Sequence, residues 1–347
     1  MKTKKLGRSD LEVTQLCLGS MTWGSVQNDE ADGHTQISHA LANGINFMDT
    51  AEMYPVNPVS AETCGNTEII IGNWFANNGQ RDKWIVATKI AGYNKAFIRP
   101  GQTINEKTIV EAVEGSLKRL QTDYIDLYQL HWPDRGSYHF RQNWSFDPTA
   151  QPRDQAQNME AVLRAADRLV KEGKVRYLGL SNESAWGTAK WLEVSEKFGL
   201  PRMQTIQNEY SLLCRLYDND LGELSHQEEV DLICYSPLAC GLLSGKYADG
   251  TIPAGTRRSL NENLNGRMTD NAVKAIDGYL AVAAKYGLNP TQMALAWCMR
   301  RPFMGSVIFG ATSIAQLDEV MGADSLELSD EVMTEIAEVH RTYPMPY

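Results

Sequence analysis

The chain has 347 residues, a formal net charge of -10 and a pI of about 5.2. Its 43% hydrophobic and 22% charged content is typical of a folded globular protein, with room for one large α/β domain or two smaller ones. The acidic balance argues against binding to nucleic acid or to an anionic membrane, because both need a basic face.

The lack of an apparent targeting signal and the pattern of cysteines predict a cytoplasmic protein. The basic start, Met1–Lys5, leads into no apolar segment, so we expect no secretory signal. No run of 18 apolar residues occurs, so we expect no membrane span. The six cysteines are scattered and form no C-x-x-C pair, which indicates a reducing compartment and no metal site.

The elements follow a regular order along the chain. Residues 2–14 are typical of a short hairpin that turns at Gly7-Arg8-Ser9-Asp10. Apolar, β-rich runs then predict eight strands, at Gln15–Leu18, Ile45–Asp49, Trp84–Lys89, Ile125–His131, Val175–Ser181, Thr205–Gln207, Asp231–Tyr235 and Ser306–Phe309. Segments of helical period lie between them, at Ala31–Asn43, Thr67–Asn77, Glu106–Leu120, Gln155–Glu172, Ser184–Phe198 and Asn219–Gln227, with a further set near the C-terminus.

Eight strands that alternate with helices predict parallel β/α units, arranged as a doubly wound sheet or a closed barrel. The turn after the first strand, Leu18–Gly24, lacks the G-x-G-x-x-G pattern of a dinucleotide-binding sheet, and no Walker A motif is present. We therefore predict a single α/β domain over residues 1–347. It is a (β/α)8 TIM barrel, which needs about 250 residues, with an N-terminal hairpin and extra C-terminal helices.

The longest irregular segment is Trp132–Arg153, directly after the fourth predicted strand. It contains five aromatic residues and three prolines. Long loops in compact domains are usually functional, and the active site of a barrel lies at the C-terminal ends of its strands. We interpret this loop as a lid or a substrate wall.

Four polar residues fall at comparable places in the predicted barrel. Asp49, Lys89 and His131 end the second, third and fourth strands, and Tyr54 follows the second strand by five residues. Side chains at successive strand ends share one face, so we expect the four to meet at the mouth of the barrel. An ion pair between Asp49 and Lys89 or a core histidine would explain each alone, but not the whole set.

These residue types suit proton transfer to a carbonyl group. A free tyrosine has a pKa of about 10, and a neighbouring ammonium lowers it by stabilising the phenolate. Asp49 would hold Lys89 charged, His131 would orient a substrate carbonyl, and Tyr54 would donate a proton to its oxygen. No side chain delivers hydride, so a nicotinamide cofactor would be needed.

The segment Gly44–Tyr54 resembles the Asp–Tyr signature of the aldo-keto reductase family. Lys89 and His131 match the other two members of that family's catalytic tetrad. The resemblance extends from the hairpin to Gly310–Ser313 and is strongest to the bacterial Tas-type and potassium-channel β-subunit-like, NADP(H)-dependent branches. It implies that Tyr54 is the general acid, that Lys89 and Asp49 tune it, and that His131 orients the substrate.

The resemblance also implies an NADPH/NADP+ site in the second half of the chain. Ser181, Asn182 and Gln207 would hold the nicotinamide carboxamide, and Tyr235 would stack on the ring. Lys246 and Arg257 would lie near the 2′-phosphate, which favours NADPH over NADH. The remaining expected contacts are a loop that covers the cofactor, with Ser236, Pro237, Leu238, Cys240, Gly241, Leu242, Ser244 and Gly245, and the adenine side, with Gly310, Thr312, Gln316 and Glu319. Val320 departs from the asparagine of the β-subunit branch.

The expected substrate is a small carbonyl compound. Many family members have a tryptophan in the substrate pocket where this chain has Met21, and we expect Trp23 to replace part of that wall. Tyr54, His131 and Trp132 complete the predicted substrate residues.

Two other functions remain as alternatives. A redox-sensing regulatory subunit would bind NADP(H) with little turnover, although His131, where the potassium-channel β-subunits have asparagine, favours an enzyme. A Schiff-base aldolase would use Lys89 as its nucleophile. That reading leaves the Tyr235–Lys246 loop without a role.

Overall fold

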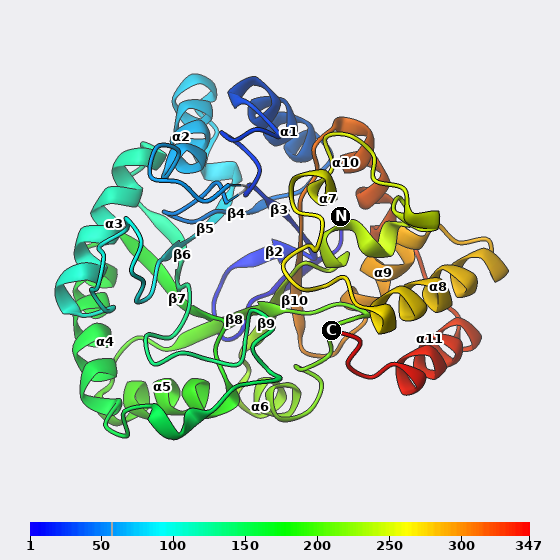
Figure 1. Ribbon diagram of the computed structural model, residues 1–347. Coiled ribbons are helices and arrows are strands. Elements are labelled where there is room, and N and C mark those ends of the chain that lie inside the picture. Colours follow the sequence, from blue (N-terminus) through cyan, green and yellow to red (C-terminus); the bar gives the residue numbers. More distant parts are fainter. Residues whose placement is uncertain (57) are drawn as a thin grey trace.

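The computed structural model describes residues 1–56 and 58–347. Eight parallel strands form a closed barrel in the order β10-β3-β4-β5-β6-β7-β8-β9 (Figure 1). The strands are β3 (Leu16–Gly19), β4 (Phe47–Asp49), β5 (Ile85–Ile90), β6 (Ile125–Leu130), β7 (Val175–Ser181), β8 (Met203–Glu209), β9 (Asp231–Tyr235) and β10 (Met304–Phe309). The predicted barrel is confirmed, and its closure leaves no unpaired sheet edge.

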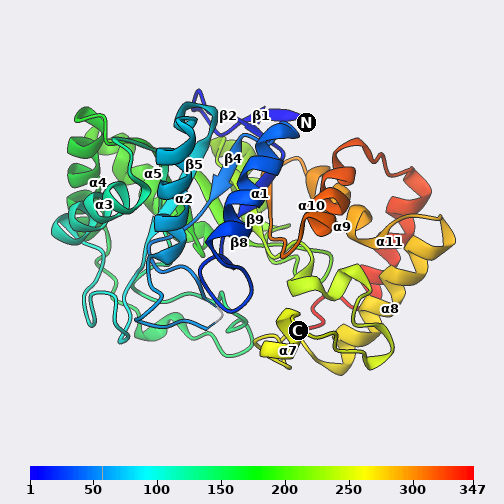
Figure 2. The ribbon, with the colours of Figure 1, turned by 90° about the horizontal axis from the view of Figure 1, so that it is seen from above.

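Most of the helices form an outer ring around this barrel. The helices of the described chain are α1 (Glu30–Ala42), α2 (Asn66–Asn78), α3 (Glu106–Leu120), α4 (Ala156–Lys171), α5 (Ala185–Phe198), α6 (Asp220–Glu228), α7 (Arg257–Leu260), α8 (Asp270–Lys285), α9 (Pro290–Met299), α10 (Ile314–Met321) and α11 (Asp330–Thr342). Among the described residues, no helix is both long enough and apolar enough to cross a bilayer. The extra C-terminal helices that we expected are present. Among them, α11 packs on α8 beside the ring (Figure 2).

Local sequence explains where several helices begin and end. Asp29 and Asn105 cap α1 and α3 with side-chain oxygens that accept backbone N–H groups of the first turn. Gly44 and Gly199, with φ of 86° and 62°, end α1 and α5 in the left-handed conformation that glycine adopts at little cost. The helix boundaries therefore follow signals that are visible in the chain.

An antiparallel hairpin, β1 (Thr3–Lys5) and β2 (Glu12–Thr14), closes the N-terminal end of the barrel. Its side chains Leu6, Leu11 and Val13 are buried in a cluster with inward-facing barrel residues. Figure 2 shows this hairpin at the opposite end of the molecule from α7. The hairpin thus closes the N-terminal end of the barrel as a plug of apolar side chains. A ligand site can form only at the C-terminal end of the strands.

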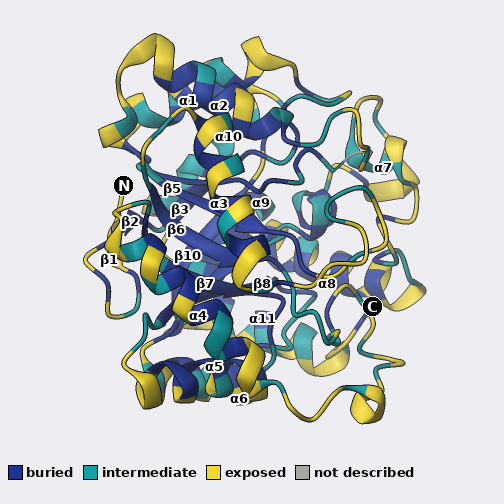
Figure 3. Ribbon diagram, turned by 90° about the vertical axis from the view of Figure 1, so that its left-hand side faces the viewer, coloured by how far each residue is buried: buried dark blue, intermediate teal, exposed yellow. Residues whose placement is uncertain are grey.

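The sixth barrel strand is longer than predicted. We expected Thr205–Gln207, whereas β8 runs from Met203 to Glu209 and is buried throughout. Polar residues at the ends of β8 hid its full length in the sequence. Glu209 can be buried because it pairs with Arg141 and Arg267, which lie far away in the sequence. Figure 3 shows the strands as the buried centre, with exposed residues on the outer faces of the helices and on the end loops.

The plug leads to a first prediction. Leu6→Ala removes a fully buried side chain and should lower the free energy of unfolding by about 2–5 kcal/mol. Val273→Ala, at a position that is 42% exposed, should change it by less than about 0.5 kcal/mol. Urea unfolding followed by circular dichroism measures both. Equal stabilities of the two variants would show that the hairpin does not contribute to the core.

Candidate active site

A buried ion pair lies at the centre of the barrel mouth. Asp49 is the last residue of β4 and Lys89 lies in the adjacent strand β5. The Lys89 Nζ donates to Asp49 Oδ2 at 2.6 Å and to the Thr50 carbonyl oxygen at 2.6 Å. Burial opposes the charge on Lys89, but Asp49 and Tyr54 outweigh it and raise the pKa of Lys89. Lys89 is therefore a fixed ammonium group.

Two glutamines complete the hydrogen bonds of Asp49. Gln207 Nε2 donates to Asp49 Oδ1 at 2.8 Å, and Gln129 Nε2 donates to the same oxygen at 3.2 Å. Gln207 was predicted as a cofactor residue, and in the structure its amide supports Asp49. Gln129 was missed, although its place two residues before His131 on a strand puts it on the same face. A buried charge needs such partners.

Tyr54 lies between Lys89 and His131. Its ring centroid is 4.8 Å from Lys89 Nζ, and its ring meets that of His131 edge-on with 5.8 Å between centroids. Burial raises the pKa of Tyr54 and Lys89 lowers it, with a net rise. The Lys89 ammonium lowers the pKa of Tyr54 as expected, but burial raises that pKa by more. The phenol is therefore protonated at neutral pH, the state that a proton donor requires.

His131 immediately follows β6. Burial, and then the charge of Lys89, hold the pKa of His131 well below its usual range, so its imidazole is neutral. Its Nδ1 is buried and has no hydrogen-bond partner among the described residues. Asn182 Nδ2 fixes the backbone of His131 by donating to its carbonyl oxygen at 2.8 Å. Because Nδ1 is enclosed by protein, the other ring nitrogen, Nε2, is the one that can form a hydrogen bond with a ligand in the cavity.

These side chains face a cavity of about 680 Å³ at the C-terminal ends of the strands, a volume suited to a small molecule. Lys89 lies behind its wall, fully buried. Most predicted residues line it: Met21, Asp49, Tyr54, His131, Trp132, Ser181, Asn182, Gln207, Tyr235, Ser236, Pro237, Leu238, Cys240, Gly241, Ser244, Lys246, Arg257, Gly310, Thr312, Gln316 and Glu319. The fold therefore brings the two halves of the predicted site together.

Besides Lys89, three predicted residues do not line the cavity. Trp23 was expected in the substrate wall, but it is fully buried in the core and its Nε1 donates to Gln36 Oε1 at 3.1 Å. Its neighbours Gly19, Ser20, Met21 and Thr22 line the cavity in its place. Leu242 packs in the core, and Gly245 faces Leu280. Leu242 and Gly245 shape the loop around the cavity without reaching it.

The polar groups at the ends of β7, β8 and β9 are connected. Ser181 Oγ donates to the Gln207 carbonyl oxygen at 2.8 Å, and Tyr235 Oη donates to Asn182 Oδ1 at 2.7 Å. Amide and hydroxyl groups that are already oriented can bind a carboxamide without reorganisation. Tyr235 presents its ring at the same cavity.

The loop after β9 comes close to the cavity through left-handed backbone. Ser236, Cys240 and Gly241 have φ of 55°, 61° and 92°. The φ of Gly241 favours glycine, and a Cβ there would also displace the end of the Lys246 side chain, whose Cε would lie 2.5 Å away. Within residues 1–56 and 58–347, neither Lys246 nor Arg257 makes an ion pair, so both cations are available to a ligand anion.

The far end of the cavity is formed by α10 and the turn before it. Gln316 Oε1 accepts hydrogen bonds from the backbone N–H and hydroxyl of Thr312, at 2.9 and 3.2 Å. Glu319 Oε1 accepts from Asn289 at 2.9 Å. Val320, the departure noted in the sequence, also lines this end and adds an apolar surface.

The Trp132–Arg153 loop forms a wall on one side of the cavity. Trp132, Phe140 and Arg141 line the cavity, whereas Trp144 is 67% exposed on the outside. Arg135 ties the loop to Glu183 through an ion pair. Phe140 and Arg141 were not predicted individually. The described residues contain no cluster of ligands suited to a metal ion.

Comparison with known proteins gives a family assignment. The model of the aldo/keto reductase family matches residues 15–341. The chain is 44% identical to Protein tas of Escherichia coli (strain K12) and to that of Shigella flexneri, over 100% of this chain and 99% of each relative. It is 33% identical to the uncharacterized oxidoreductase YrpG of Bacillus subtilis (strain 168), over 96% of this chain and 94% of that protein.

The buried pair generates a second prediction. Asp49→Asn leaves the Lys89 ammonium without a carboxylate and should lower the free energy of unfolding by about 3–5 kcal/mol. Lys89→Met should be similarly destabilising, because Asp49 then keeps only amide donors. The double variant should lose at least about 2 kcal/mol less than the sum of the two single losses. Guanidinium unfolding gives the three values, and simple additivity would contradict the coupling.

Proposed function

The chain belongs to the aldo/keto reductase family of oxidoreductases, and we propose that it uses NADPH to reduce an aldehyde or ketone to an alcohol. The observation that carries this proposal is the position of Tyr54. Its protonated phenol faces the cavity between a fixed ammonium, Lys89, and a neutral imidazole, His131.

Tyr54 acts as the general acid in this proposal. A carbonyl oxygen bound beside the phenol receives its proton as negative charge develops on that oxygen. His131 would position the oxygen through Nε2, the imidazole nitrogen that is not enclosed by protein. The phenolate left on Tyr54 is stabilised by Lys89, whose charge Asp49 maintains. These groups are already in place, so little reorganisation opposes the transfer.

The cavity residues fit a nicotinamide dinucleotide. The bound cofactor would supply the hydride that no side chain can provide. Ser181, Asn182 and Gln207 would hold its carboxamide, and the ring of Tyr235 would support the nicotinamide. Lys246 and Arg257, without carboxylate partners in the described chain, would bind the 2′-phosphate. The six cysteines are free, which suits a reducing compartment, and we place the protein in the cytoplasm.

The alternatives fit these observations less well. A Schiff-base aldolase needs an uncharged, accessible lysine, whereas Lys89 is fully buried and its pKa is raised. A regulatory subunit that only binds the cofactor does not need a neutral histidine beside the phenol. The reductase proposal gives a role both to the charged, buried Lys89 and to the neutral His131.

The third prediction tests the general acid. Tyr54→Phe should lower kcat for NADPH-dependent reduction of 4-nitrobenzaldehyde about 100-fold or more, because the proton donor is lost. The dissociation constant of NADPH, measured by fluorescence quenching, should stay within about twofold, because Tyr54 is not among the proposed cofactor contacts.

Tyr93→Phe provides a matched control, because it removes a hydroxyl from a tyrosine that is 40% exposed and outside the cavity. It should retain wild-type kcat. Retained activity in Tyr54→Phe would overturn the mechanism. NADPH binding by the wild type without turnover of any carbonyl would favour the regulatory alternative.

The fourth prediction tests the cofactor preference. Lys246→Ala should weaken NADPH binding about tenfold or more and NADH binding less than about twofold, because only NADPH carries the 2′-phosphate. Lys274→Ala, an exposed lysine on α8, makes the same change in net charge and should leave both constants unchanged. Titration by fluorescence measures them. Equal weakening for both cofactors would remove the 2′-phosphate assignment.

A further inference from the structure

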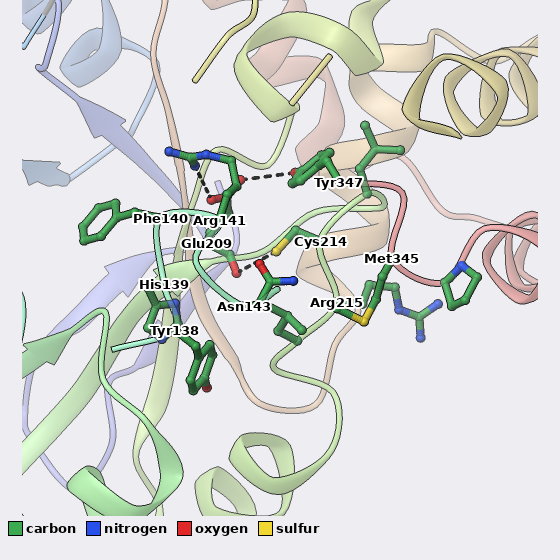
Figure 4. A pocket seen from close by; sticks show the side chains of 13 residues that line it. Tyr138, His139, Phe140, Arg141, Asn143, Glu209, Cys214, Arg215, Met345 and Tyr347 are labelled. Atoms are coloured by element: carbon green, nitrogen blue, oxygen red, sulfur yellow. Dashed lines mark hydrogen bonds and ion pairs between the residues drawn. The ribbon is translucent and has the colours of Figure 1, made fainter. Parts of the chain in front are cut away.

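A cluster of charged residues borders the cavity where β8 ends. Glu209 Oε1 accepts a hydrogen bond from Arg267 Nε at 2.9 Å, and Glu209 Oε2 accepts one from Arg141 at 3.1 Å. Tyr347 Oη donates to Oε1 at 3.2 Å. Figure 4 shows the contacts of Arg141 and Tyr347 with this carboxylate. The four residues are distant from one another in sequence, so the cluster exists only in the folded chain.

The cluster carries one positive charge in excess, because two guanidinium groups share one carboxylate. Glu209 and Arg267 are 6% and 4% exposed, so solvent compensates little of this charge. Arg267 uses a further nitrogen to donate to the Leu264 carbonyl oxygen at 3.0 Å. Arg141 differs, because only its Nη1 makes a hydrogen bond to the described residues, and its Nη2 is not among the buried atoms without a partner. The unused binding capacity therefore lies on Arg141.

Arg141 lines the same cavity as Tyr54 and His131. The preceding ring, Phe140, meets Trp132 edge-on with 6.4 Å between centroids, and Trp132 lies 4.9 Å from the ring of His131. These contacts place Phe140, the residue next to Arg141, near the proton-transfer residues. The cations proposed for the 2′-phosphate, Lys246 and Arg257, belong to the loop after β9 and to α7.

We propose that Arg141 binds an anionic group of the carbonyl substrate, so that the enzyme selects carbonyl compounds that carry a carboxylate. A guanidinium group presents several N–H donors in one plane, which match the two oxygens of a carboxylate. Glu209 and Arg267 are positioning residues that hold Arg141 at the wall. A bound carboxylate balances the excess charge. The inference rests on the reductase function proposed above.

The test compares each charged aldehyde with an uncharged partner of similar reactivity. The pairs are 3- and 4-carboxybenzaldehyde and their methyl esters, assayed with NADPH. Wild type should have the higher kcat/KM for at least one acid over its ester. Arg141→Gln should reduce that ratio about tenfold or more, and Arg141→Lys should reduce it less, because the charge remains.

Arg153→Gln is the matched control. Arg153 is exposed in the same loop and outside the cavity, so this variant makes the same change in net charge and should keep the wild-type ratio. A purely structural role for Arg141 would lower kcat/KM for acid and ester equally, which would overturn the inference. A loss of NADPH affinity in Arg141→Gln with an unchanged ratio would assign the residue to the cofactor and also overturn it.

A binding measurement separates this inference from the proposed function. Calorimetry gives the affinity of 3- and 4-(hydroxymethyl)benzoate, the corresponding alcohols, for the protein with NADP+. Arg141→Gln should weaken the binding of at least one about tenfold or more. If wild type reduces no aldehyde but this difference is observed, the reductase function fails while the anion site stands. Equal binding by wild type and Arg141→Gln would overturn the anion site whatever the activity.

Discussion

The site depends on one buried ion pair. Lys89 can be charged inside the barrel only because Asp49 lies 2.6 Å from its Nζ, and Asp49 can be buried only because Gln129 and Gln207 donate to its other oxygen. Four adjacent or facing strands contribute these groups. The charge of Lys89 then acts on both neighbours, since it favours the phenolate of Tyr54 and keeps the His131 imidazole neutral.

The closed barrel makes this arrangement possible. The hairpin fills one end with apolar side chains, and the C-terminal ends of the parallel strands bring the polar site residues together at the other end. Four basic side chains border the cavity, those of Arg141, Lys246, Arg257 and Arg267, in a chain whose net charge is -10. Such a local reversal of sign attracts anionic ligands. It suits both the phosphates of the proposed cofactor and a charged group on a substrate.

Much of the fold was predictable because strands and helices have different hydrophobic periods. The sequence pattern alone predicted the eight strands and the hairpin, and the structure confirms them. Glycines marked the ends of helices such as α5. The prediction for β8 was too short, because Glu209 at its end is polar. The prediction for Trp23 was wrong, because the path of the chain after β3 turns that ring into the core. Sequence spacing does not specify the direction of a loop side chain.

The sequence by itself determined the fold class and the identity of the four polar residues at the barrel mouth. Their spacing at successive strand ends requires only the alternation of a strand and the common direction of parallel strands. The tertiary structure decided the balance of burial and charge on Tyr54, the support of Asp49 by Gln129, and the meeting of Arg141 and Arg267 on Glu209. These properties depend on distances between segments far apart in the chain, and no local pattern encodes such distances.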